Sequence, residues 1–474
     1  MKELMIPLKT ESKIPLYEQI YQYIREEIKG SRMQCDTRLP STRTLSAFLQ
    51  VSRSTVELAY AQLVAEGYIH SQPYKGYYVS DISLLYQLKT ETYPQQDIVM
   101  PKTEQYNLDF SLKGIDLESF PYNAWRRITR EVLSVDNKEL FLGGTSKGDY
   151  DFRKTVSIYL RESRGVDCSP HQIIIGAGNE YLLMLLCQMF KLLYKSEKVS
   201  IAMENPTYMQ AYKVLYGLES NIVAVPVDKN GMSYEQLRQY KEVQAAYIMP
   251  SHQFPTGNVM PMKRRLELLK WAQEKENRYI IEDDYDSEFR YKGMPIPSMQ
   301  ASDGEGKVIY LGTFSKSIAP AIRISYMVLP KPLLNIYEEK LWFISSTVSR
   351  IDQAILYRFL EDGYFERYLN KMRKLYKGKH DLLLERLKPF KKAFRIRGEY
   401  AGLHILLEDR RGWSEKEIIE AAEKEECRVY GMGGYMLKEP EQGGGPGTVI
   451  VGYAALTEEQ IIEGTDRLKK AWRI

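Results

Sequence analysis

The sequence predicts an α/β protein in three parts: a small helical domain over residues 1–80, a linker over 81–105 and a large domain over 106–474. At 474 residues the chain is too long for a single hydrophobic core. The stretch 81–105 is polar, contains proline and lacks periodicity, as linkers do. Beyond it, amphipathic helical stretches alternate with short apolar runs at 172–175, 199–202, 246–249, 279–281 and 308–311. This alternation predicts a mostly parallel sheet covered on both faces, followed by a smaller α+β lobe near the end of the chain.

Composition narrows the class of protein. Hydrophobic residues make up 44% and charged residues 27% of the chain, as in ordinary globular proteins. The net charge of +4 is close to neutral for this size, so it neither requires nor excludes a nucleic-acid partner. The four cysteines are scattered, which favours reduced thiols over disulfides and predicts no metal site. No apolar leader or membrane-length run is present, so we expect a cytoplasmic protein with no membrane partner.

The first domain begins with three predicted helices. Apolar residues recur at helical spacing over Leu16–Lys29. Ser41 stands where it can cap a helix over Thr42–Leu49, and Ser52 where it can cap another over 53–66. Two helices joined by so short a turn are the core of a helix-turn-helix.

A hairpin follows these helices. Its predicted strands are residues 67–70 and 76–79, and its tip holds Pro73, Lys75 and Gly76. Helix, turn, helix and hairpin form the plan of a winged helix-turn-helix, whose second helix enters the major groove of DNA while the wing touches the backbone or the minor groove. The alternative is a helical interaction domain without nucleic acid. Ten Lys and Arg against eight Asp and Glu in residues 1–80 do not separate the two.

The placement of the polar residues favours DNA. Basic side chains stand near the helix starts and at the hairpin tip, where they would face phosphates. We therefore predict double-stranded DNA as a partner, contacted by Arg38, Ser41, Arg43, Ser52, Arg53, Ser54, Thr55, Lys75 and Gly76.

The large domain carries a pattern that suits pyridoxal phosphate. This cofactor needs a lysine for an imine, an acidic partner for its pyridine nitrogen, and donors with a fixed cation for its phosphate. The hydroxyl-rich run 313–316 ends in Lys316 and is followed by Arg323. Together these residues supply the imine-forming lysine and the donors and cation for the phosphate. Asp283 and Tyr285 follow the apolar run 279–281 and supply the acid and a phenol for the ring oxygen. A lone Ser-x-Lys is as well explained by a solvated lysine, but the combination favours the cofactor.

A glycine loop supports the same interpretation. Residues 175–180 follow a predicted strand and open a helix over 181–190. Backbone amides at such a helix start can hold a phosphate. This loop is a weak signal alone, but it precedes the acid and the lysine in the expected order, so we predict Gly178 and Asn179 as phosphate donors.

Longer motifs carry a resemblance to known families. Leu-Pro-Ser-Thr-Arg at 39–43 and Ser-Arg-Ser-Thr-Val at 52–56 resemble the signature of the GntR family of regulators. Residues 106–474 resemble the fold-type I pyridoxal-phosphate aminotransferases, and the whole chain resembles the MocR-type (GabR-like) group of GntR regulators. The resemblance implies a homodimer that reads paired DNA half-sites.

The resemblance also assigns roles to single residues. It implies that Lys316 forms the imine and is the catalytic residue, and that Asp283, rather than Asp284 or Asp286, pairs with the pyridine nitrogen. The remaining cofactor residues that it implies are Tyr285 at the ring oxygen, Tyr208 stacked on the ring, and Thr313, Ser315 and Arg323 at the phosphate.

Two departures from the aminotransferase pattern affect function. Phe254 stands before the Pro-x-Gly turn where ordinary aminotransferases place asparagine. Gln210 and the region near Gly434 stand where GabR-like chains place arginines that hold a carboxylate. The first hypothesis is therefore a regulator that senses pyridoxal phosphate or an amine rather than GABA. The alternatives are an active aminotransferase carrying a DNA-binding domain, and a scaffold with a vestigial pocket.

Overall fold

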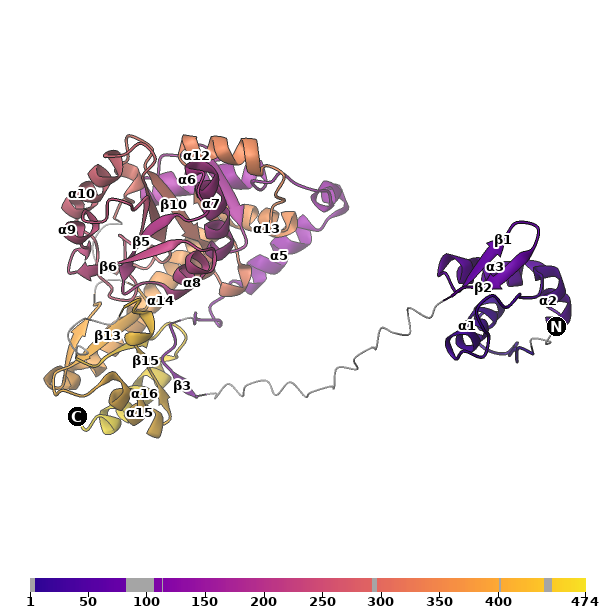
Figure 1. Ribbon diagram of the computed structural model, residues 1–474. Helices are drawn as coiled ribbons and strands as arrows, with labels where there is room; N and C mark the ends of the chain where they lie inside the picture. The colour runs from indigo at the N-terminus through magenta and orange to yellow at the C-terminus, as the bar shows by residue number, and fades with distance from the viewer. Residues whose placement is uncertain (1–4, 82–105, 113, 292–295, 400–401, 439–445) are drawn as a thin grey trace. The chain divides into compact units, whose positions relative to one another are not determined.

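The chain divides into two units, Met1–Thr103 and Glu104–Ile474 (Figure 1). The computed structural model describes residues 5–81, 106–112, 114–291, 296–399, 402–438 and 446–474. The predicted linker lies outside the described residues apart from Asp81. In the part of the chain that is described, no helix has both the length and the apolar character needed to cross a membrane.

The first unit is the predicted winged helix-turn-helix, which is confirmed. Its elements are α1 (Leu16–Lys29), α2 (Thr42–Leu49), α3 (Arg53–Ala65) and the antiparallel hairpin of β1 (Ile69–Gln72) and β2 (Gly76–Val79). Both predicted caps form, because Ser41 accepts the Thr44 N–H at 3.1 Å and Ser52 accepts the Thr55 N–H at 3.2 Å. The first strand starts later than predicted. Gly67, with φ of 78°, turns the chain at the end of α3 instead of pairing.

The second unit is built on an eight-stranded sheet with the order β4-β11-β10-β9-β8-β5-β6-β7. Neighbouring strands from β10 to β6 are parallel, whereas β11 and β7 run antiparallel to their neighbours. The predicted mostly parallel sheet is therefore confirmed, with antiparallel strands toward its edges. Its strands are β4 (Ile173–Gly176), β5 (Ser200–Asn205), β6 (Asn221–Asp228), β7 (Gly231–Met232), β8 (Ala245–Ile248), β9 (Tyr279–Asp284), β10 (Val308–Thr313) and β11 (Ser325–Val328).

Helices cover both faces of this sheet. Strand alternation sends Ile174 into one hydrophobic cluster and its neighbours Ile173 and Ile175 into the other. The first cluster contains residues of α7 (Asn179–Tyr194), α8 (Met209–Gly217) and α12 (Lys331–Ile336). On the opposite face lie α6 (Tyr150–Arg164), α10 (Met262–Gln273), α13 (Arg350–Glu361) and α14 (Tyr364–Arg386). Helix α5 (Tyr122–Val132) packs on α13.

The C-terminal lobe is a four-stranded antiparallel sheet with two helices, as the α+β pattern predicted. The strand order is β12 (Phe394–Arg397), β13 (His404–Asp409), β16 (Thr448–Gly452) and β15 (Tyr430–Gly431), and the helices are α15 (Glu415–Lys424) and α16 (Glu458–Ala471). Strand β3 (Leu108–Asp109) pairs with β14 (Cys427–Arg428) of this lobe. The segment that opens the second unit is thus held by the last part of the chain (Figure 1).

Candidate functional site

A cavity of about 710 Å³ opens where the central parallel strands end. The carboxyl ends of parallel strands meet at one edge of a sheet, which is where such folds place ligands. Residues at or just beyond the ends of β8, β9 and β10 line it, together with α7, α8 and the C-terminal lobe. Of the predicted cofactor residues, those that line the cavity are Asn179, Tyr208, Asp283, Tyr285, Thr313, Ser315, Lys316 and Arg323.

The predicted imine-forming lysine lies on the one-turn helix α11 (Phe314–Ser317) that follows β10. Thr313 caps this turn by accepting the Ser315 N–H at 3.1 Å. The Lys316 ammonium group donates to the backbone carbonyl of Leu112 at 2.6 Å. Lys316 is half-buried, so its amine can meet a ligand inside the cavity.

Asp283 is the acid that faces the cavity from the end of β9. It is buried and accepts hydrogen bonds from Asn179 Nδ2 at 3.2 Å and from the Tyr247 hydroxyl. Burial raises the pKa of Asp283 to about 7, and the neighbouring charge of Asp284 acts in the same direction. A carboxyl so placed can share or accept a proton near neutral pH.

The two acidic neighbours of Asp283 are engaged elsewhere. Asp284 accepts from Arg164 Nε at 2.7 Å and does not line the cavity, because alternation along β9 turns it to the other face. Asp286 lines the cavity and lies 2.8 Å from His252 Nδ1. The same ring nitrogen lies 2.9 Å from the Tyr285 hydroxyl. His252 thus fixes both the predicted phenol and Asp286.

A second imidazole stands behind this group. His404, at the start of β13, donates from Nε2 to the Pro255 carbonyl at 2.8 Å. Burial and the nearby His252 lower the pKa of His404 to about 4, so its ring is neutral at neutral pH. The C-terminal lobe therefore contributes a neutral polar ring to the cavity wall.

The predicted phosphate end contains free hydrogen-bonding capacity and a cation. The Ser315 Oγ is buried and has no hydrogen-bond partner within the described residues. The Gly178 N–H is donated to the Gly176 carbonyl at 2.9 Å. Gly178 also leaves space for the neighbouring guanidinium, because a Cβ there would lie 2.1 Å from Arg323 Nη2. That guanidinium bonds to Glu180 Oε2 at 2.6 Å.

The opposite end of the cavity is aromatic. Phe254, the residue that departs from the aminotransferase pattern, packs edge-on against Tyr208 and Tyr285, with centroid distances of 6.0 and 5.9 Å, and against Tyr435 at 5.1 Å. Tyr208, predicted to stack on the cofactor ring, therefore borders the space that such a ring would need.

No arginine other than Arg323 is among the described residues that line the cavity. Gln210 and Gly434 line this end, as the sequence predicted for positions that lack the carboxylate-binding arginines. Lys213 and Glu415 are the charged groups here, and Glu415 accepts the Gly433 N–H at 2.8 Å. A ligand carboxylate would thus meet one lysine and one fixed carboxylate rather than an arginine fork.

The residues present fit pyridoxal phosphate. The cavity combines a lysine, a buried acid, a phenol, and hydroxyl and guanidinium groups that can bind a phosphate. Asn179 Oδ1 and Ser315 Oγ are buried without a hydrogen-bond partner in the part of the chain that is described. Buried polar atoms normally have partners, so these two have capacity for a bound group.

The sequence did not predict three of the groups that hydrogen-bond to the predicted site residues. These are Tyr247, which bonds to Asp283, the Leu112 carbonyl, which accepts from Lys316, and Glu180, which bonds to Arg323. Each joins segments distant in sequence, and only the strand register or the chain path brings them together.

The predicted DNA-contacting side chains are mostly on the surface of the first unit. Arg38, Arg43, Arg53, Lys75, Ser41, Ser52 and Ser54 are exposed, and Thr55 and Gly76 are half-buried. Arg38 pairs through its backbone with Tyr78, so it lies beside the wing. Arg53 bonds to Glu57 at 2.7 Å on the exposed side of α3. Tyr74, which the sequence argument passed over, is fully exposed at the wing tip.

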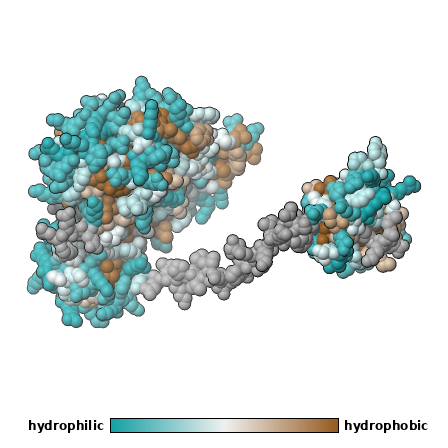
Figure 2. Space-filling view, viewed as in Figure 1, coloured by the Kyte–Doolittle hydropathy of each residue, from teal (hydrophilic) through white to brown (hydrophobic). Residues whose placement is uncertain are grey.

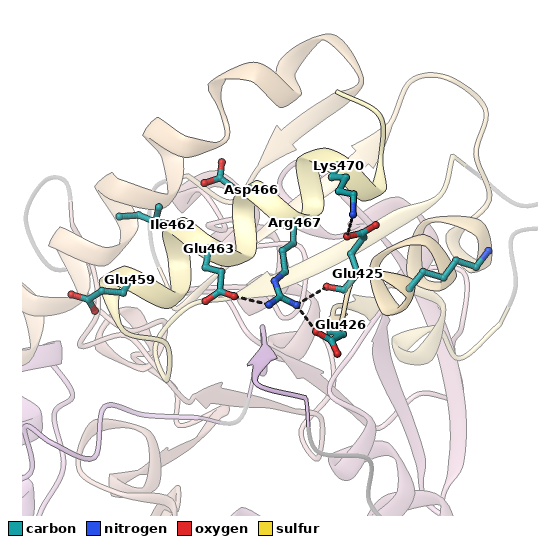
Figure 3. A pocket seen from close by; sticks show the side chains of 9 residues that line it. Glu425, Glu426, Glu459, Ile462, Glu463, Asp466, Arg467 and Lys470 are labelled. Atoms are coloured by element: carbon teal, nitrogen blue, oxygen red, sulfur yellow. Dashed lines mark hydrogen bonds and ion pairs between the residues drawn. The ribbon is translucent and has the colours of Figure 1, made fainter.

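A second hollow lies between the end of α15 and α16 (Figure 3). Its charged side chains bond to one another: Arg467 to Glu426 at 2.6 Å and to Glu463 at 2.7 Å, and Lys470 to Glu425 at 2.8 Å. None of the predicted site residues lines it. These groups satisfy each other, and the hollow is not a candidate for the chemistry.

Comparison with known proteins gives two family matches. Residues 16–79 match the bacterial regulatory proteins of the gntR family. Residues 115–468 match the class I and II aminotransferases. The two matches fall within the first and the second structural unit, respectively.

Single relatives extend along the whole chain. The uncharacterized HTH-type transcriptional regulator YdeL of Bacillus subtilis is 41% identical over 465 residues, which cover 97% of each chain. The HTH-type pyridoxine biosynthesis transcriptional regulator PdxR of Corynebacterium glutamicum is 29% identical over 86% of each chain. Among solved structures, the multiple substrate aminotransferase from Thermococcus profundus superposes with a TM-score of 0.69 at 26% identity, covering 78% of this chain and 92% of that one.

Proposed function

Since this chain belongs to the GntR-type transcriptional regulators that carry a class I and II aminotransferase domain, we propose that it binds DNA and senses pyridoxal phosphate, or an amine that reacts with it, through Lys316. The observation that carries the proposal is the shared cavity, in which the lysine and the phosphate donors of residues 313–323 meet the acid and the phenol of residues 283–285, together with Asn179 and Tyr208. A protein that regulates transcription acts where the DNA is, so the proposal places it in the cytoplasm.

Each residue has a role in holding the cofactor. Asp283 would face the pyridine nitrogen and keep a proton there, and Tyr285 would bond the ring oxygen while His252 fixes its orientation. Ser315, whose hydroxyl has no partner among the described residues, and Arg323 would hold the phosphate. When bound, the cofactor supplies an aldehyde that condenses with amines and a ring that withdraws electrons. Lys316 supplies the amine that attaches it, and the Leu112 carbonyl orients that amine.

The first unit supports the DNA-binding half of the proposal. The exposed start of α3 presents Arg53 and Ser54, which is where helix-turn-helix proteins contact base edges. The wing tip presents Lys75 and Tyr74, which suits contact with the backbone or the minor groove.

A homodimer is part of the proposal. The large unit exposes apolar side chains near the short helix η1 (Val135–Phe141) and after the helical segment that ends at Leu341. Val135, Phe141, Leu142, Trp342 and Phe343 are each at least 65% exposed. Brown apolar atoms gather at the end of this unit beyond α5 (Figure 2). Apolar surface of this kind is typical of a protein interface. A two-fold dimer would read paired half-sites.

The second candidate function is an active aminotransferase with a DNA-binding domain. It is favoured by the presence of the lysine, acid, phenol and arginine in one cavity and by the likeness to an aminotransferase structure. Phe254 at the asparagine position argues against efficient transamination. Steady turnover of an amino donor with a keto acid, at a rate far above one event per protein chain, would establish this function instead.

The test of the main proposal is covalent attachment. Purified protein incubated with pyridoxal phosphate should be yellow, and borohydride should bleach the band while fixing the cofactor to the peptide that contains Lys316. Lys316→Ala should lose this labelling but keep its fold, because the phosphate donors remain. Equal reductive labelling of wild type and variant would remove Lys316 from its role.

A further inference from the structure

The pair formed by Arg323 and Glu180 occupies the place that the proposed function gives to the cofactor phosphate. Arg323 ends the turn after α11 with φ of 51°, and its guanidinium lies against the start of α7. Glu180, in the first turn of α7, accepts from Arg323 Nη2 at 2.6 Å, and both side chains line the cavity. A carboxylate therefore already sits where the guanidinium and the positive end of a helix meet.

Gly178 makes this arrangement possible. Its φ is 95°, and a Cβ built on it would lie 2.1 Å from Arg323 Nη2 and 2.7 Å from Glu180 Oε2. The ion pair thus fills the space above the glycine loop, which is the space that a phosphate bound to this helix start would need.

A phosphate and Glu180 cannot both bond Arg323 in this way without like charges in contact. The Glu180 side chain can turn toward solvent, because it is 34% exposed and the Arg323 side chain is 50% exposed. The other acids lining the cavity are held elsewhere: Asp283 by Tyr247, Asp286 by His252, and Glu415 by the Gly433 N–H. Glu180 is therefore the carboxylate that competes for this cation.

We propose that Glu180 is an internal competitor for the cofactor phosphate: it holds Arg323 when the site is empty and must turn away when pyridoxal phosphate binds. The inference rests on the proposed function and adds a consequence to it. A regulator that reports the concentration of pyridoxal phosphate must exchange it, whereas an enzyme gains by retaining it. Glu180 lowers the affinity of the site and so moves its occupancy into a range that changes with concentration.

The experiment compares dissociation constants for pyridoxal phosphate and for pyridoxal, which lacks the phosphate, by equilibrium dialysis of full-length protein at fixed salt. Glu180→Gln keeps the size of the side chain and removes its charge. We expect it to bind pyridoxal phosphate about two- to fivefold more tightly than wild type, the size expected for a partly exposed ion pair, with unchanged binding of pyridoxal. Glu180→Ala should shift in the same direction.

The matched control is Glu426→Gln, which breaks another carboxylate–guanidinium pair of 2.6 Å, with Arg467, outside the cavity (Figure 3). It should leave both constants unchanged. Equal or weaker binding of pyridoxal phosphate by both Glu180 variants would overturn the inference, and so would equal tightening for both ligands. Failure of the proposed function is recognised separately, because wild-type protein would then not be labelled at Lys316 by the cofactor and borohydride.

Discussion

At the scale of single residues, the buried carboxyl group of Asp283 serves the site but lowers the stability of the folded protein as the pH rises. Its ordinary pKa is 3.8, and burial raises the pKa to about 7 in the folded protein. The folded chain therefore holds a proton that the unfolded chain releases. The stability contributed by the protonated group is fully present below about pH 4 and is lost as the pH rises through about 7.

The first prediction follows from this sign. We compare the free energy of unfolding of cofactor-free Asp283→Asn with that of wild type. The variant's advantage over wild type should be about 1–3 kcal/mol larger at pH 8 than at pH 5, because wild type loses the contribution of its protonated Asp283 over this range. Urea unfolding at both pH values measures it. Burial also raises to about 7 the pKa values of three other acids, Glu204, Glu282 and Glu288. Both proteins contain them, so their contribution to the pH dependence cancels in the difference. A difference that does not change with pH would contradict the prediction. The same variant should bind pyridoxal phosphate more weakly.

The second prediction concerns the effector. Gln210, Lys213 and Glu415 line the end of the cavity where a ligand carboxylate would lie. A lysine is a point charge rather than a planar fork, and the fixed Glu415 repels an anion. GABA and common α-amino acids should therefore bind poorly to the cofactor-loaded protein in a spectral titration with an amine panel. Micromolar conversion of the spectrum by GABA would restore a GabR-like effector.

Single residues differ in how well the sequence predicts them. Lys316 and Asp283 were predicted because each stands at a fixed place in a short motif, at the end of an apolar run. Tyr247 was not predicted, because its bond to Asp283 depends on the pairing of β8 with β9. Glu180 was not predicted as a partner of Arg323, because the two are joined only by the path of the chain around the cavity.

At the scale of elements, the second helix of the helix-turn-helix gives the third prediction. Arg53 is exposed at the start of α3, where it bonds to Glu57. Losing a good contact to a base edge costs on the order of 1–3 kcal/mol. Arg53→Ala should weaken specific DNA binding by about tenfold or more, on the same scale. The control is Arg467→Ala, in a helix of the other unit. A mobility-shift titration at fixed salt in which Arg467→Ala has the larger effect would refute this contact.

Elements with a local cause were predicted accurately. The starts of α2 and α3 agree with the sequence because Ser41 and Ser52 form the caps that their types predict. The start of β1 was predicted wrongly because Gly67 is a residue that can extend a strand or turn a chain. The order of the strands in the large sheet could not be predicted from the sequence, since it depends on crossovers between distant segments.

At the scale of the whole molecule, the proposed dimer gives the fourth prediction. Phe141→Glu places a charge among the exposed apolar side chains of the large unit. It should shift the protein toward the monomer in light scattering coupled to size exclusion, because a buried unpaired charge is costly. Ile462→Glu, a comparable change at an exposed apolar residue of α16, should leave the mass unchanged. A monomeric wild type, or equal effects of the two variants, would contradict the proposed interface.

The fifth prediction joins the two units. If pyridoxal phosphate is the signal, wild-type protein should bind its operator with different affinity in the cofactor-free and cofactor-loaded states. Lys316→Ala should show no such difference. Fluorescence anisotropy with labelled operator at constant salt measures both, since salt alone changes DNA affinity. Identical affinities of the two wild-type states would leave an amine, rather than the cofactor, as the signal.

The family resemblance read from short motifs is confirmed at this scale, since the relatives align over nearly the whole chain. Sequence motifs identify each part of the protein, but contacts between segments that are distant in sequence are seen only in the folded chain.

One such contact is the bond from Lys316 to the Leu112 carbonyl. Leu112 lies just after β3, the first strand beyond the linker, and β3 is anchored to β14 while Phe110 is fully buried in the C-terminal lobe. Segment 108–112 is therefore held by that lobe at β3 and by the Lys316 amine at Leu112. If the imine proposed for Lys316 forms, its nitrogen gives up the bond to the Leu112 carbonyl, while β3 keeps its pairing with β14. We infer that occupancy of the cavity loosens the segment that follows the linker, so that chemistry at Lys316 would act on the part of the chain that leads to the DNA-binding unit.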